Sequence, residues 1–215
     1  MKYRFLSAAV IALAVATIVA CGKSSPATPS DGTGTTSVSN PGTPGSSTGR
    51  LSVSLKDSPF SEASAVLIKF SEVSAHHSGG SWFTVPFANG AENRFCDLKQ
   101  LQAKTATDIL GVATLETGHY TEIRLTVASA MLYFDQTPTT AGPCYSTEPT
   151  MTPSAGKAAA VVNIPSGVIK LNRPFDIDGG ATVNMLLDFD GDKSIHMLGN
   201  GKYQMSPVIS VVSVQ

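Results

Sequence analysis

Three aspartates occur at every second position within the stretch LLDFDGDKSIHML: Asp188, Asp190 and Asp192. On a β-strand alternate residues share one face, so the first two would project together while the apolar residues beside them point into a core. Neighbouring carboxylates repel only weakly in water, but once buried they require a cation. Ca²⁺ binds about six to eight oxygen ligands, including carboxylates. These three residues, with Asp57 as a fourth, are therefore candidate calcium ligands.

The same residues also allow a structural interpretation. Counted from Asp188, the glycine lies at the fourth position rather than the sixth, and Gly199 occupies the place of the bidentate glutamate of an EF-hand. Asp57 precedes a Ser-Pro pair, where an aspartate commonly accepts backbone hydrogen bonds in a turn.

In this alternative Asp188 or Asp190 forms an ion pair with Arg124 or Lys170, and Asp192 belongs to a turn. The sequence leaves the calcium site and the ion-pair interpretation both open.

No catalytic constellation accompanies the aspartates in the sequence. The G-x-S-x-G pattern occurs as GSSTG, but inside a Gly/Ser/Thr/Pro-rich segment that cannot form the required strand-to-helix elbow. His76 and His77 are adjacent and would point to opposite faces of a strand, and His119 and His196 are isolated. We therefore expect no enzymatic activity. A hydrolase whose site assembles from loops is the weaker alternative.

Aromatic residues offer one further route to function. Trp82 and Phe83 follow HHSGG, a hairpin signal, and a β-sandwich that binds sugar or peptide does so with exposed aromatics. A lone tryptophan is more often part of the core, so we expect Trp82 to be buried.

The N-terminus predicts export and lipid attachment. Two basic residues precede an apolar run over 5–19, which is short for a membrane span and ends at a small residue before Cys21. The sequence IVAC resembles the lipobox of bacterial lipoproteins, so residues 1–20 would be a signal peptide and Cys21 would be acylated. Gly22 resembles the residue found in lipoproteins sent to the outer membrane. We expect a lipid-anchored protein of the cell envelope.

Residues 21–49 are rich in Gly, Ser, Thr and Pro and show no apolar periodicity, which predicts a disordered tether. Residues 50–215 form one domain, in which alternating or continuous apolar runs are separated by glycine-rich turns. This pattern predicts an all-β domain, a single β-sandwich, with little helix beyond a turn or two around Leu98 to Leu101. The closing strand PVISVVSVQ could be central or an exposed edge.

The remaining two of the three cysteines, Cys96 and Cys144, are a candidate disulfide, because an exported protein allows one to persist. Two free thiols are the alternative. The disulfide would pin the long polar loop 135–156 to the body of the domain. The formal net charge is −1, and nucleic-acid binding has no electrostatic basis here.

Several segments together resemble a known family. These are GRLSVSLKDSPF, ETGHYTEIRLTV, IPSGVIKLNRPFDI, LLDFDGDKSI and YQMSPVISVV, and in this order they are similar to domain of unknown function 4382 of bacterial lipoproteins. The resemblance implies a transthyretin-like or carbohydrate-binding-like sandwich and a surface-tethered exported protein, and it implies no activity. The family's recurrent positions fall on Asp57, Pro59, Gly118, Tyr120, Arg124, 165–167, Lys170, Asp188, Asp190, Lys193 and Ser194, whereas Asp192 is peculiar to this chain.

The functional hypothesis is a lipid-anchored, non-enzymatic envelope module with a binding, adhesion or assembly role. Its expected partners are the membrane, through the anchor, and an envelope protein or glycan. The alternatives are a calcium-stabilised surface domain and an envelope hydrolase. No cofactor is expected apart from the calcium considered above.

Overall fold

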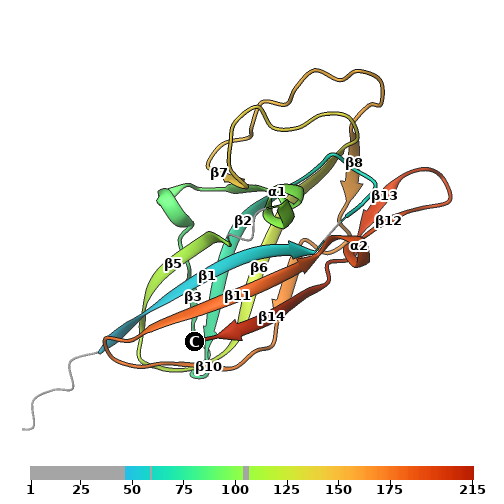
Figure 1. Ribbon diagram of the computed structural model, residues 1–215. Helices are drawn as coiled ribbons and strands as arrows, with labels where there is room; N and C mark the ends of the chain where they lie inside the picture. Colours follow the sequence, from blue (N-terminus) through green and yellow to red (C-terminus); the bar gives the residue numbers. More distant parts are fainter. Residues whose placement is uncertain (1–46, 59, 104–106) are drawn as a thin grey trace, which may run out of the picture. The chain divides into compact units, whose positions relative to one another are not determined.

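The computed structural model describes residues 47–58, 60–103 and 107–215 (Figure 1). The predicted signal peptide, the lipidation at Cys21 and nearly all of the predicted tether lie outside these residues. The first strand begins at Thr48, two residues before the predicted start of the domain. None of the described helices has the length and apolar character that a transmembrane span requires.

The described strands form two sheets. The smaller sheet has four strands, and the pairing of its two central strands, β1 and β11, is parallel. Its outer pairings are antiparallel. In spatial order the strands are β14 (Ile209–Val214), β11 (Thr182–Asp190), β1 (Thr48–Ser58) and β5 (Asp108–Glu116).

The larger sheet has ten strands and is organised around the long antiparallel pair of β2 and β6. Short strands attach to this pair on both sides. Its main path runs β12 (Ile195–Met197), β13 (Tyr203–Met205), β8 (Ala160–Asn163), β6 (Gly118–Tyr133), β2 (Ala65–His77), β4 (Arg94–Asp97) and β7 (Cys144–Tyr145), while β3 (Trp82–Thr84) pairs with β2, and β9 (Val168–Leu171) and β10 (Phe175–Ile177) pair with β6.

Helix is confined to short segments in the described chain. They are η1 (Ala88–Gly90), α1 (Leu98–Ala103) and α2 (Gly191–Ser194), and α1 lies where the sequence predicted a helical turn. The two sheets pack face to face over one apolar core, to which both contribute alternate residues. Leu187 and Phe189 of β11 and Ile123 and Leu125 of β6 are fully buried in it. The predicted all-β sandwich with little helix is confirmed.

The closing strand is an edge. β14 pairs with β11 on one side and, among the described strands, with nothing on the other. Its Val212 lies at a register shift in the pairing with β11 and is half exposed. A bulge of this kind bends an edge strand and makes its pairing with another chain less favourable.

The predicted disulfide is confirmed: Cys96 and Cys144 are bonded across β4 and β7, with Cα atoms 4.1 Å apart. It pins the loop 135–156 over a small apolar cluster on the outer face of the larger sheet, made of Leu67, Phe95 and Tyr145. The loop is therefore built into the domain rather than merely attached to it.

A second attachment lies at the two ends of this loop. One carboxylate oxygen of Asp135 accepts hydrogen bonds from the backbone amides of Ala155, Gly156 and Lys157, at 2.6 to 2.9 Å. The Ser154 hydroxyl donates to the same carboxylate. Desolvation is the largest single influence and raises the pKa of Asp135, but the hydrogen bonds together outweigh it, so the pKa is lowered from its ordinary value.

Asp97, next to the disulfide, predicts a pH dependence of stability. Its Oδ1 accepts hydrogen bonds from the amides of Val66 and Lys99, but its burial raises its pKa above the ordinary 3.8. A raised pKa in the folded state means that the folded protein holds the proton more tightly than the unfolded chain. The stability of the wild type should therefore fall as the pH rises from about 4 through the folded-state pKa. Asp97→Asn keeps the Oδ1 acceptor and should not show this fall.

The measurement is urea unfolding of wild type and Asp97→Asn between pH 3 and pH 8. The difference between the two curves isolates Asp97, because Asp135 and the other carboxylates titrate equally in both proteins. If the free energies of unfolding of the two proteins change in parallel with pH, burial does not raise the pKa of Asp97.

Candidate functional site

Asp188 faces outward on β11, between two fully buried residues, as the sequence predicted. Its Oδ2 lies 2.9 Å from Nζ of Lys56. Lys56 is its register partner on the parallel strand β1, so both side chains stand on the same face of the smaller sheet. The ion pair anticipated for Asp188 exists, but with Lys56.

Asp190 ends β11 and begins α2. Its side chain accepts a hydrogen bond from the backbone amide of Lys193 at 3.0 Å and contacts Nζ of the same lysine at 2.7 Å. These bonds lower the pKa of Asp190 and raise the pKa of Lys193. Asp192 is exposed on α2 and accepts a 3.3 Å hydrogen bond from the amide of Ser61. The DFDGDKS run thus forms a strand end and a capped helical turn.

The partners predicted from the sequence, Arg124 and Lys170, are wrong. Both stand on the outer face of the larger sheet, on the opposite side of the sandwich from Asp188, and they are register partners of each other on β6 and β9. Arg124 instead contacts Glu122 on its own strand, at 3.1 Å.

The four candidate calcium ligands are not gathered. Asp57 lies two residues after buried Leu55 on β1 and therefore shares its inward face. Asp188 faces outward on the neighbouring strand. Within the described ranges, no three His, Cys, Asp or Glu side chains lie close enough together to hold a metal ion. Calcium binding stays a prediction that only a solution experiment tests.

Such an experiment compares wild type with Asp190→Ala in excess calcium and in chelator. We expect Asp190→Ala to lose about 1 kcal/mol of stability through its helix cap, equally in both buffers. The measurement is the melting temperature. A wild-type midpoint several degrees higher in calcium, absent from the variant, would instead identify an ion site.

Trp82 is exposed, so the expectation of a buried tryptophan is wrong: 39% of its surface is accessible. β3 has only three residues, and its middle residue, Phe83, packs against the core. Because side chains alternate along a strand, Trp82 must then face outward. His76 faces outward beside it and His77 contacts buried Tyr120, so the two histidines point to opposite faces as predicted.

Around the tryptophan lies a group that we call the Trp82 cluster: Trp82, His76, Thr121, Glu122 and Arg124. The guanidinium of Arg124 lies 3.8 Å from the ring centroid of Trp82, so it reaches from β6 across β2 to β3. Glu122 accepts hydrogen bonds from two nitrogens of Arg124, at 3.3 and 3.1 Å. The His76 ring lies 4.6 Å from the Trp82 ring and shares a 2.8 Å hydrogen bond with Thr121. Aromatic, guanidinium and carboxylate groups are thereby held in place on an open face.

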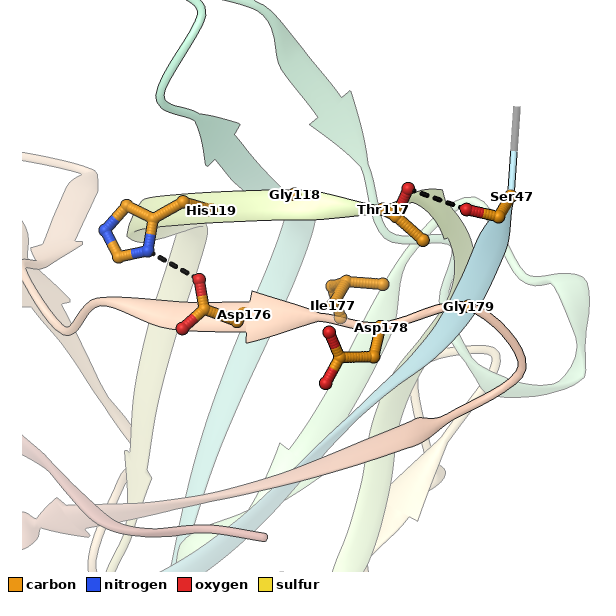
Figure 2. Close-up of a pocket in the computed structure, with 8 residues that line it drawn as sticks. All are labelled: Ser47, Thr117, Gly118, His119, Asp176, Ile177, Asp178 and Gly179. Atoms are coloured by element: carbon orange, nitrogen blue, oxygen red, sulfur yellow. Dashed lines mark hydrogen bonds and ion pairs between the residues drawn. The ribbon is translucent and has the colours of Figure 1, made fainter. Parts of the chain in front are cut away.

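A polar hollow of about 460 Å³ lies next to this cluster, at His119 on β6, three residues before Glu122. Figure 2 shows the residues that line it. His119 on β6 and Asp176 on β10 face each other across the two strands, with Nδ1 and Oδ1 2.7 Å apart. At the other end of the view, the hydroxyls of Ser47 and Thr117 are 2.9 Å apart. The lining is completed by Gly118, Ile177, Asp178 and Gly179.

The hairpin between β2 and β3 joins the hollow to the cluster. The amide of Ser78 donates a 2.8 Å hydrogen bond to the carbonyl of His119. Gly118 has a φ of +147°, and a Cβ there would collide with the His77 ring. A side chain at this glycine would therefore push against the His77 ring, which accepts a hydrogen bond from the amide of Gly79 in the hairpin.

The groups on this surface can form hydrogen bonds and can stack on a planar or ring-shaped group. A histidine held by an aspartate resembles the orienting half of a catalytic triad. The hydroxyls of Ser47 and Thr117 bond each other, however, and Figure 2 shows them at the opposite end of the hollow from His119. From the sequence alone His119 is expected to be isolated, because the order of the residues does not reveal that β10 pairs with the start of β6.

Comparison with known proteins identifies a family. A family model described as Domain of unknown function (DUF4382) matches residues 48–207, which span most of the chain. No curated protein and no solved structure matches.

Proposed function

The chain belongs to the DUF4382 family, a domain of unknown function, and we propose that in this member it is a lipid-anchored, non-enzymatic binding module of the cell envelope. The observation that carries the proposal is the exposed Trp82, stacked with Arg124 on an open sheet face. Exposed aromatic and arginine side chains are enriched where proteins bind ligands or partners, because they offer large contact areas at low entropic cost.

The arrangement of the Trp82 cluster favours binding over mere surface decoration. Arg124 is fixed on one side by Glu122 and on the other by the ring of Trp82. A side chain held in one geometry loses less conformational freedom when a ligand arrives, so more of the contact energy appears as affinity. An arginine that contacts only solvent does not need neighbouring groups to hold it in one geometry.

The anchor part of the proposal rests on the IVAC sequence before Cys21. Several acyl chains on one cysteine hold a protein at a membrane, since each buried methylene contributes about 0.8 kcal/mol. The outer membrane is the proposed location, and an adhesion or assembly role would follow from holding a partner there.

We expect Cys21→Ser to abolish acylation and to move the protein from the membrane fraction to the soluble fraction of a bacterial host. Mass spectrometry of the N-terminal peptide and fractionation measure the two effects. Wild-type protein that carries no lipid would overturn the anchor and leave the binding module untouched.

The binding role is tested with the full chain against three envelope preparations: glycans, peptidoglycan and membrane proteins. We expect one of them to retain wild type and to lose Trp82→Ala. The matched control is Met197→Ala, which removes an apolar side chain that is 63% exposed on β12, at the far edge of the same sheet. Retention of wild type by none of the three, or equal retention of both variants, would contradict a binding role for this face.

A further inference from the structure

We propose that the ligand of the Trp82 cluster is a neutral carbohydrate chain, which stacks on Trp82 and extends to the His119–Asp176 pair of the neighbouring hollow. This inference rests on the proposed function and names the ligand class. Its basis is the shape, the charge balance and the hydrogen-bonding character of one end of the larger sheet's outer face.

The side chains concerned form a row across four adjacent strands. Trp82 on β3 is the register partner of His76 on β2, and His76 is the register partner of Glu122 on β6. His119, three residues before Glu122 on β6, is the register partner of Asp176 on β10. With strands about 4.8 Å apart, the row spans roughly 14 Å across the sheet from β3 to β10, and the offset of three residues between Glu122 and His119 adds about 10 Å along β6. This length suits a short run of sugar rings rather than a single small molecule.

The charge balance of this face argues against an anionic polymer. Arg124 is paired with Glu122, and the hollow adds the carboxylates of Asp176 and Asp178 beside His119. Lys170 lies beside Arg124 as its register partner on β9. Polyanions are held by several cations that are free to contact them, and the paired groups here do not supply such a field. A polyanion is therefore disfavoured, and the ligand should carry little negative charge.

The pairs themselves suit hydroxyl groups. A sugar hydroxyl both donates and accepts a hydrogen bond, so its best partner is a donor and an acceptor held side by side. The Arg124–Glu122 pair and the His119–Asp176 pair each present such a combination. The exposed part of Trp82 offers an apolar surface to the C–H face of a sugar ring. A small-ligand site is usually composed of an aromatic surface with a few polar groups around it.

Trp82 also supplies the probe, because it is the one tryptophan in the chain. Its fluorescence therefore reports on this site alone. The experiment titrates the full chain with neutral oligosaccharides of glucose, mannose, xylose and N-acetylglucosamine, and with polygalacturonate as an anionic comparison. At least one neutral oligosaccharide should give a saturable change in emission and protect Trp82 from acrylamide quenching, whereas polygalacturonate should give neither.

Three variants test whether oligosaccharide binding depends on the row of side chains from Trp82 to Asp176. The affinities are measured by calorimetry. Trp82→Ala and Asp176→Asn should each weaken binding at least tenfold, and Trp82→Phe should retain part of the affinity because it keeps a stacking ring. Met197→Ala should bind as wild type does. Thermal melting of every variant checks that the fold is intact, and Trp82→Phe serves as the test if Trp82→Ala does not fold.

The outcomes separate this inference from the function on which it rests. If no oligosaccharide changes the emission of Trp82 while an envelope protein is retained in a Trp82-dependent way, the carbohydrate inference falls and the binding module stands. Preference for polygalacturonate would likewise overturn the neutral ligand. If neither oligosaccharides nor envelope preparations respond to Trp82, both proposals fail.

Discussion

Removing the Cys96–Cys144 disulfide should lower the free energy of unfolding by about 4 kcal/mol. The two cysteines are 48 residues apart, and in the chain-entropy model a closed loop of this size restricts the unfolded chain by that amount. The loss is a large share of the roughly 5–15 kcal/mol by which a domain is usually stable. The measurement is guanidinium unfolding of wild type and of the double variant Cys96→Ala, Cys144→Ser.

Two controls separate the crosslink from the side chains. Reduced wild type has the same sequence as oxidised wild type, so it should lose a similar amount if the crosslink is responsible. Asp135→Asn loosens the other attachment of the loop 135–156, by weakening the bonds to three backbone amides, and should cost much less. A change below about 1 kcal/mol on reduction would mean that folded-state contacts, rather than the crosslink, hold this loop.

Replacing Tyr120 with alanine should destabilise the domain by about 3–5 kcal/mol, the usual cost of deleting a large buried aromatic. Tyr120 is fully buried on β6. Its ring stacks on Phe175 of β10 with centroids 5.2 Å apart, and it contacts His77 and Phe83 edge-on. One ring therefore supports the strands that carry Trp82, His119 and Asp176.

The matched control is Tyr120→Phe. It keeps the ring and loses only the 3.0 Å hydrogen bond from the hydroxyl to the carbonyl of Glu116, a loss of about 1 kcal/mol. Urea unfolding gives the two free energies, and Trp82 fluorescence reports on the surface above. Tyr120→Ala should shift the Trp82 emission even where the domain is still folded, and Tyr120→Phe should not. Equal costs for the two variants would refute the supporting role of the ring.

These two predictions concern opposite ends of the larger sheet. The disulfide fixes a loop over the outer face near β4 and β7, whereas Tyr120 lies beneath the end that carries β3 and β10. If carbohydrate binding depends on the Trp82 end alone, loss of the disulfide should reduce stability without changing the affinity of the protein that remains folded.

The sequence by itself determined which side of the strand with the aspartates faces the core. Alternation placed Leu187 and Phe189 inside and Asp188 outside, because successive side chains on a strand point to opposite faces whatever its neighbours are. The disulfide was predictable for a different reason: if the chain is exported and Cys21 is lipidated, as proposed, two cysteines remain that can pair. Neither inference requires knowledge of which strands are adjacent.

Only the tertiary structure decided which residues meet across strands. Lys56 reaches Asp188 because β1 and β11 pair in parallel, and His119 meets Asp176 because β10 pairs with β6. Trp82 faces outward because its neighbour Phe83 has a place in the core that the sequence does not reveal. Local periodicity fixes the face of a side chain, but its partners depend on strand order and register, which arise from the burial of the whole core at once.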